Sequence, residues 1–173
     1  MLRLSKKADY ALIAMKHLAL NASRAEARTR EGGAGASSTS AREIAEQYDI
    51  PIELLAKVLQ RLVRTGLLAS TQGTRGGYTL SRPPKSISVA DVIQAIDGPL
   101  TVTACSTEKN DCEQYSKCNV RGPLWQIRER IVSTLGTVSI AEMAAESDSA
   151  PAAVELAVVR RGGTSAGHGP RQG

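Results

Sequence analysis

The apolar positions of the chain repeat at the three-to-four-residue spacing of amphipathic helices in three segments, residues 5–20, 51–65 and 123–135. The second segment is predicted to bury Ile52, Leu55, Leu59 and Leu62. The third carries a single apolar stripe, formed by Leu124, Ile127, Ile131 and Leu135. Such a stripe needs a partner, which is either the core of the same domain or another subunit.

A short helix is predicted directly before residues 51–65. Ser40 and Glu43 stand three positions apart, the spacing of a capping box, and the helix that they begin ends near Tyr48. The following turn leads into residues 51–65, and Gly66 suits the C-terminal cap of that second helix. Two helices joined by a tight turn predict a helix-turn-helix.

Two short strands follow, at residues 67–71 and 78–81, joined by a glycine-containing turn at residues 72–77. This hairpin predicts the wing of a winged helix-turn-helix. Further helices are expected where Ser88 and Asp91, and then Ser139 and Glu142, stand three positions apart. The fold class predicted is mainly α with a small β-hairpin wing, followed by a long helix.

Two segments lack any apolar period and are rich in small residues and arginine. We interpret residues 21–39 as a flexible insertion and residues 147–173 as a disordered tail. The predicted organisation has four parts: a winged helix-turn-helix at residues 1–100, a cysteine loop at 101–121, the long helix and a short C-terminal helix at 122–146, and the tail.

The helix of residues 51–65 is the expected DNA-recognition helix, because the second helix of a helix-turn-helix enters the major groove. Its polar positions that could face DNA are Glu53, Lys57, Gln60, Arg61 and Arg64. The arginines suit phosphates, whereas Glu53 and Lys57 near the front of the helix could approach base edges. Arg75 at the wing tip could reach a minor groove or a phosphate.

A net charge of +5 agrees with a polyanionic partner. Alternatively, Glu53 and Lys57 form a surface ion pair, and the winged helix binds protein.

Cys105, Cys112 and Cys118 form a C-x6-C-x5-C pattern in one polar loop. Three thiolates on an adaptable loop can hold an iron–sulfur cluster, either 2Fe-2S or 4Fe-4S. Structural zinc usually needs four ligands with close C-x2-C pairs, which this pattern does not provide.

No C-x-x-C motif is present and the histidines are His17 and His168, so we expect no enzyme. The absence of a secretory or membrane-spanning segment predicts a cytoplasmic protein.

Several short motifs recur in the order typical of one protein family. They are RLS at residues 3–5, ADYAL at 8–12, EIAE at 43–46, LVRTGL at 62–67 and GTRGGYTL at 73–80. With these motifs and the cysteine trio, residues 1–143 resemble the IscR/NsrR/RirA-type (Rrf-two) family of winged-helix regulators. The resemblance implies homodimers that bind palindromic operators, dimerise through the helix at 123–135 and respond to iron–sulfur status, iron, redox state or nitric oxide.

The resemblance also implies a fourth cluster ligand. IscR-like members have a histidine after the third cysteine, but Arg121 follows here and cannot bind a metal. NsrR-like members use an aspartate in the first helix of the partner subunit, and Asp9 matches it; alternatively, Asp9 is an ordinary surface carboxylate. The predicted function is a DNA-binding repressor that senses through a cluster ligated by the three cysteines. The alternatives are a cluster-free regulator controlled by thiol oxidation, a small molecule or a partner protein, and a cluster-carrying interaction protein.

Overall fold

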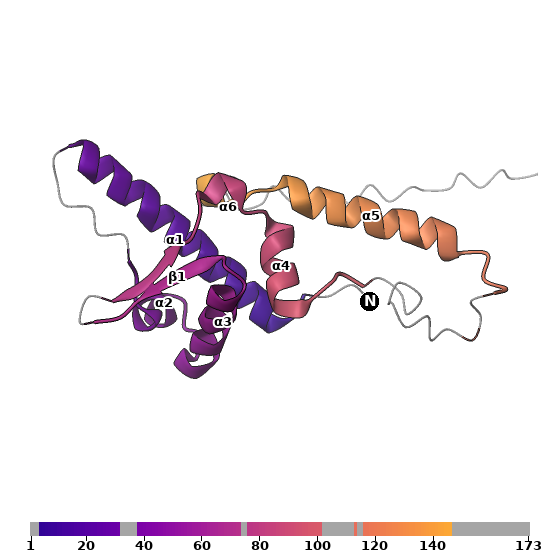
Figure 1. The fold of residues 1–173 in the computed structure, drawn as a ribbon, viewed down its shortest axis with the longest axis horizontal. Helices are drawn as coiled ribbons and strands as arrows, with labels where there is room; N and C mark the ends of the chain where they lie inside the picture. The colour runs from indigo at the N-terminus through magenta and orange to yellow at the C-terminus, as the bar shows by residue number, and fades with distance from the viewer. Residues whose placement is uncertain (1–3, 32–37, 74–75, 102–112, 114–115, 147–173) are drawn as a thin grey trace, which may run out of the picture.

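A computed structural model describes residues 4–31, 38–73, 76–101, 113 and 116–146 (Figure 1). The helices and strands within this part of the chain are α1 (Lys6–Arg30), α2 (Ala41–Gln47), α3 (Ile52–Arg64), β1 (Leu68–Thr71), β2 (Gly77–Leu80), the 3-10 helix η1 (Pro84–Ser86), α4 (Val89–Asp97), α5 (Arg121–Thr137) and α6 (Ile140–Ala145). The predicted fold class, mainly helical with one β-hairpin, is confirmed.

Helix α1 is the centre of the domain, and α3, α4 and α6 all pack against it (Figure 1). The helix begins after Ser5, whose Oγ accepts a hydrogen bond from the Ala8 N–H at 3.1 Å. Its buried face combines Met15 and Leu18 with several fully buried alanines. Because alanine side chains are small, neighbouring helices can approach α1 closely, and leucine and isoleucine side chains from α3 and α6 complete the core.

Helices α2 and α3 form the predicted helix-turn-helix. Ser40 caps α2 by accepting from the Glu43 N–H at 3.2 Å. Between the helices the backbone turns at Asp49, which has a positive φ of 51°. Helix α3 ends before Gly66, whose φ of 74° is the left-handed conformation that glycine adopts without strain. The chain therefore leaves α3 directly into the hairpin.

Strands β1 and β2 are antiparallel, with Leu68 opposite Leu80 and Thr71 opposite Gly77. Thr39, before α2, adds an isolated bridge to this hairpin: its N–H donates to the Tyr78 carbonyl at 3.1 Å, and its carbonyl accepts from the Tyr78 N–H at 2.8 Å. The wing is therefore tied to the segment that leads into the helix-turn-helix.

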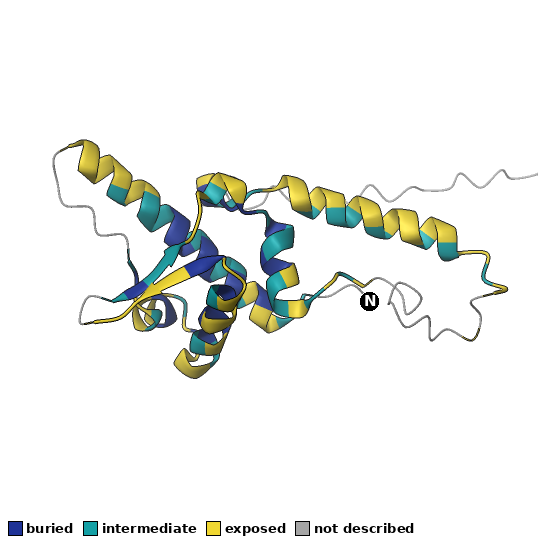
Figure 2. Cartoon of the chain, viewed as in Figure 1, coloured by how far each residue is buried: buried dark blue, intermediate teal, exposed yellow. Residues whose placement is uncertain are grey.

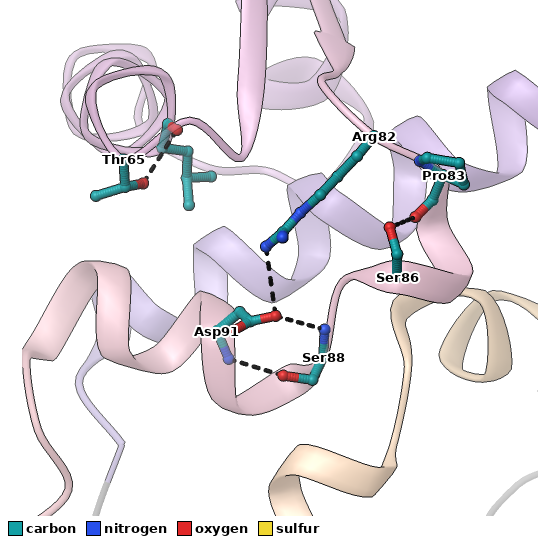
Figure 3. A network of polar contacts seen from close by, with 7 residues as sticks. Thr65, Arg82, Pro83, Ser86, Ser88 and Asp91 are labelled. Atoms are coloured by element: carbon teal, nitrogen blue, oxygen red, sulfur yellow. Dashed lines mark hydrogen bonds and ion pairs between the residues drawn. The ribbon is translucent and has the colours of Figure 1, made fainter.

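Helix α4 begins with a full capping box at Ser88. The Ser88 Oγ accepts from the Asp91 N–H at 3.1 Å, and the Asp91 carboxylate accepts from the Ser88 N–H at 3.0 Å. Arg82, which follows the wing, pairs with the same carboxylate at 3.5 Å (Figure 3). These contacts connect the base of the wing to the start of α4.

Helix α5 extends away from the winged domain and packs against α4, but none of its residues is buried (Figures 1 and 2). The chain then returns to the core through α6. Val89 N–H donates to the Val138 carbonyl at 2.9 Å and Ile140 N–H donates to the Ile87 carbonyl at 2.8 Å, so the end of α5 is joined to the start of α4. No helix within the described ranges is long and apolar enough to cross a membrane.

The prediction of a flexible insertion at residues 21–39 is wrong for residues 21–30, which continue α1. Alanine and arginine have high helix propensity, and the arginines of the last turn, Arg28 and Arg30, interact favourably with the helix dipole. The prediction also fails at Thr39, which is only 2% exposed. Residues 32–37 and the predicted tail at 147–173 lie outside the described residues.

Candidate DNA-binding surface and cysteine loop

One face of α3 is polar and solvent-exposed along the whole helix. Glu53, Lys57, Gln60 and Arg64 occur at spacings of three and four residues, so they share a face, and all four side chains are exposed. The opposite face, built from leucines and one valine, is buried against the core. Helix α3 thus presents donors and acceptors outward from a rigid support.

Arg61 lies on the edge of this face that borders α4. Its Nε donates to the Ala95 carbonyl in the last turn of α4 at 2.9 Å. The last carbonyls of a helix have no partner within the helix, so this bond satisfies one of them. Sequence reasoning assigned Arg61 only to DNA phosphates and missed this contact, because the two residues are 34 positions apart.

The wing packs against the body of the domain, with β1 against α3 and β2 against α1 (Figure 1). Gly77, the first residue of β2, lies so close to Thr39 that a Cβ there would be 2.6 Å from the Thr39 carbonyl oxygen. A glycine is therefore required for the wing to approach the segment before α2. Arg75, the predicted wing-tip contact, lies outside the described residues.

A buried polar cluster holds α1, α2 and the Thr39 segment together. His17, only 4% exposed, accepts at Nε2 from Asn21 Nδ2 at 2.9 Å, which leaves Nδ1 to donate to Tyr48 Oη at 3.2 Å. Asn21 also donates to Thr39 Oγ1 at 3.0 Å. Burial lowers the pKa of His17, which favours the neutral form of the imidazole. His17 is thus a packed, hydrogen-bonded histidine, and its partners could not be identified from the sequence.

The structure describes one residue of the cysteine trio. Cys118 is a free, half-buried thiol shortly before α5, whereas Cys105 and Cys112 lie outside the described residues. Asp9 is exposed in the first turn of α1. Within the described ranges no three histidine, cysteine or acidic side chains gather into a metal site. The ligand set remains a prediction from the sequence.

Residues 4–146 match the Rrf2 family, which is described as an iron-dependent transcriptional regulator. The chain belongs to the Rrf2 family. It is 34% identical over 143 residues to the HTH-type transcriptional regulator IscR of Xenorhabdus nematophila, a match covering 82% of this chain and 79% of that protein. IscR of Escherichia coli O1:K1 / APEC is 30% identical over 143 residues, with 82% and 80% covered.

Among solved structures, this Rrf2 protein is similar to CymR (YrzC), the global cysteine regulator of B. subtilis. The TM-score is 0.64 at 27% identity, covering 86% of this chain and all of that one. It is also similar to T. potens IscR, with a TM-score of 0.58, 25% identity, and 85% and 89% covered. These relatives are regulators rather than enzymes. The protein is therefore a winged-helix transcriptional regulator that works through DNA, as its sequence motifs predict.

Proposed function

We propose that this Rrf2 regulator is a cytoplasmic, homodimeric repressor that binds a palindromic operator and senses through an iron–sulfur cluster held by Cys105, Cys112 and Cys118. The observation that carries the DNA-binding part is the polar face of α3 beside the wing. A helix so exposed, supported from behind by the core, can enter a major groove without rearrangement. The wing, tied to Thr39, flanks the same groove.

The two ends of α3 have different roles in this proposal. Glu53 near its start accepts hydrogen bonds, as from a cytosine amino group in the major groove, and so contributes to sequence preference. Gln60 extends the same face. Arg64 in the last turn contacts a phosphate, which contributes affinity without sequence information. Arg75 reaches the backbone or minor groove from the wing.

Helix α5 supplies the proposed dimer interface. It has no buried residue, although it carries large apolar side chains: Trp125 and Ile127 are each 46% exposed. Leu124, Ile131 and Leu135 lie half-buried on the same helix. Apolar surface of this extent is commonly covered by a second subunit. Two copies joined through α5 present two recognition helices, which matches the symmetry of a palindrome.

The donor set of the cysteine loop fits an iron–sulfur cluster. Thiolates are the preferred ligands of such clusters, and three of them occur within residues 105–118. When bound, the cluster supplies iron and redox chemistry that responds to oxidants and nitric oxide. Asp9 of the partner subunit is the proposed fourth ligand. Cys118 lies shortly before α5, so the loop is joined in sequence to the proposed dimer helix.

The DNA-binding part is tested by selecting duplexes from a random pool and measuring affinity by fluorescence anisotropy at several salt concentrations. Arg64→Ala is expected to weaken binding to selected and random duplexes alike and to lower the salt slope by about 0.9 for each phosphate that the variant no longer neutralises. Glu53→Ala is expected to weaken only the selected duplex. The control is Lys85→Ala, which removes an exposed cation on η1, next to α6. Equal affinity of wild type for every duplex would contradict a sequence-specific regulator.

The cysteine part is tested by Cys112→Ala. The variant is expected to lose its iron and visible absorption while its circular dichroism stays that of the wild type. Unchanged iron content would contradict the ligand assignment.

The likeness to CymR, a cysteine regulator, favours a second candidate function. In this alternative, thiol oxidation, a small molecule or a partner protein controls the same DNA-binding domain without a cluster. It predicts operator binding by iron-free protein that changes on thiol oxidation or on addition of the effector.

A further inference from the structure

A pocket of about 180 Å³ opens between the first turn of α1, the middle of α3 and the end of α4. Its walls are formed by three cationic side chains, Lys7, Lys57 and Arg61, and its apolar part by Val58 and Ile96. Lys7 comes from α1, some 50 positions before the other two. Among the described residues, no acidic side chain lines the pocket. The fold therefore concentrates positive charge at one point of the surface.

We infer that this pocket holds one phosphate of the operator backbone, gripped jointly by Lys7, Lys57 and Arg61. The inference rests on the proposed DNA-binding function and deepens it. It also changes one assignment made from the sequence: Lys57, predicted to approach base edges, contacts the phosphate backbone of the DNA in this proposal.

The charge of the three side chains is available to an anion. Within the described part of the chain, none of them forms an ion pair with a carboxylate. The acidic residue next to Ile96 in sequence is Asp97, whose carboxylate already accepts from the Ser5 N–H at 3.1 Å and the Ser5 Oγ at 2.5 Å. Lys7 also lies in the first turn of α1, where the helix dipole repels a cation. An anion in the pocket relieves that repulsion.

Arg61 is already positioned for this role. The bond from its Nε to the Ala95 carbonyl holds the guanidinium against α4, which leaves its terminal amino groups to donate elsewhere. A guanidinium that is held in place loses less entropy on binding a phosphate than a free side chain does. The two lysines add charge from the other sides of the pocket.

The location favours DNA over a free anion. Lys57 belongs to the exposed face of α3, and the pocket lies where that face meets α1 and α4. When a helix lies in a major groove, the phosphate backbones border the groove, so a cationic pocket at the edge of the helix faces one of them. A single phosphate would then set the depth and register of α3.

The test is a coupling measurement between protein charge and individual phosphates. A duplex selected by the wild type is prepared with a neutral methylphosphonate at each backbone position in turn. Its affinity is then measured for wild type, Lys7→Gln, Lys57→Gln and the double variant. We expect one position per half-site where neutralisation weakens wild-type binding about tenfold, in the range of a charged hydrogen bond, but hardly affects the double variant. Lys7→Gln and Lys57→Gln are expected to couple to that same position.

The control is Lys85→Gln, which removes a cation beside α6 and is expected to couple to no position. Thermal unfolding by circular dichroism shows whether each variant is folded. Coupling of the two lysines to different phosphates, or to none, overturns the inference while leaving the proposed function intact. Failure of the wild type to bind any duplex contradicts both.

Calorimetric titration with inorganic phosphate distinguishes the source of the anion. We expect no saturable binding to the protein alone. Saturable binding that disappears in Lys57→Gln would identify a free anion as the ligand and overturn the assignment to the operator backbone.

Discussion

Replacing Gly77 by alanine tests how the wing is attached to the rest of the domain. The new Cβ would lie 2.6 Å from the Thr39 carbonyl oxygen and 2.8 Å from its carbonyl carbon. Both are backbone atoms, so the clash cannot be relieved by rotating a side chain. We expect the wing and the Thr39 segment to separate.

The magnitude follows from the two hydrogen bonds between Thr39 and Tyr78, at 2.8 and 3.1 Å. A net contribution of about 0.5–1.5 kcal/mol for each gives a loss of roughly 1–3 kcal/mol in the free energy of unfolding. Thr39 is buried, so water does not readily replace the missing partners. For a domain of about 140 residues, the smallest loss in this range corresponds to a melting temperature lower by about 2–4 °C, and larger losses lower it further.

The assay is urea denaturation followed by circular dichroism at one fixed protein concentration, because association would change the apparent stability. The matched control is Gly136→Ala on α5, where a Cβ meets no atom within 4 Å. Alanine favours a helix over glycine by up to about 1 kcal/mol, so this variant is expected to lose no stability. If Gly77→Ala unfolds at the same urea concentration as the wild type, the close approach of the wing to Thr39 is refuted.

Three further results are expected. The pKa of His17 is below its ordinary value of 6.5, so near and just below that pH the unfolded state binds more protons than the folded state. The free energy of unfolding therefore falls as the pH decreases through about 6.5. Urea titrations of His17→Gln are expected to show a shallower dependence on pH. Ser88→Ala removes the acceptor for the Asp91 N–H and lowers the free energy of unfolding by about 1 kcal/mol; no change in urea would show that the cap is dispensable. Ile127→Glu places a charge on the exposed apolar surface of α5 and is expected to yield monomers in light scattering. The control Gln126→Glu is expected to stay dimeric. Equal molar masses for the two variants would place the dimer interface elsewhere.

The features predicted correctly depend on signals within a few residues. Ser88 with Asp91 marks the start of a helix because a capping box is complete within one turn. Gly66 marks the end of α3 for a similarly local reason, its positive φ. The amphipathic period of residues 51–65 likewise identified the buried face of α3 at Leu55, Leu59 and Leu62. It was wrong at Ile52, which lies in the first turn and is 46% exposed.

The prediction of a flexible segment at residues 21–30 failed because it relied on the lack of an apolar period and not on helix propensity. The segment contains mainly alanine, arginine and other small or polar residues, so it has no apolar stripe although it continues the helix of residues before it. An apolar period shows which face of a helix is buried. A helix that projects into solvent buries no face, so it needs no such period.

The remaining features join residues far apart in the chain. His17 meets Tyr48 across 31 positions, and Lys7 reaches the pocket beside Lys57 only because α1 packs on α3. No local pattern encodes such a meeting. The ligand role of the cysteine trio, inferred from its spacing in the sequence, remains a proposal.

Whether the regulator senses through a cluster on its cysteine trio is tested by a visible absorption spectrum with iron and sulfide analysis on protein purified without oxygen. We expect broad visible absorption with matching amounts of iron and sulfide. A colourless, iron-free protein that resists reconstitution with iron and sulfide would contradict it.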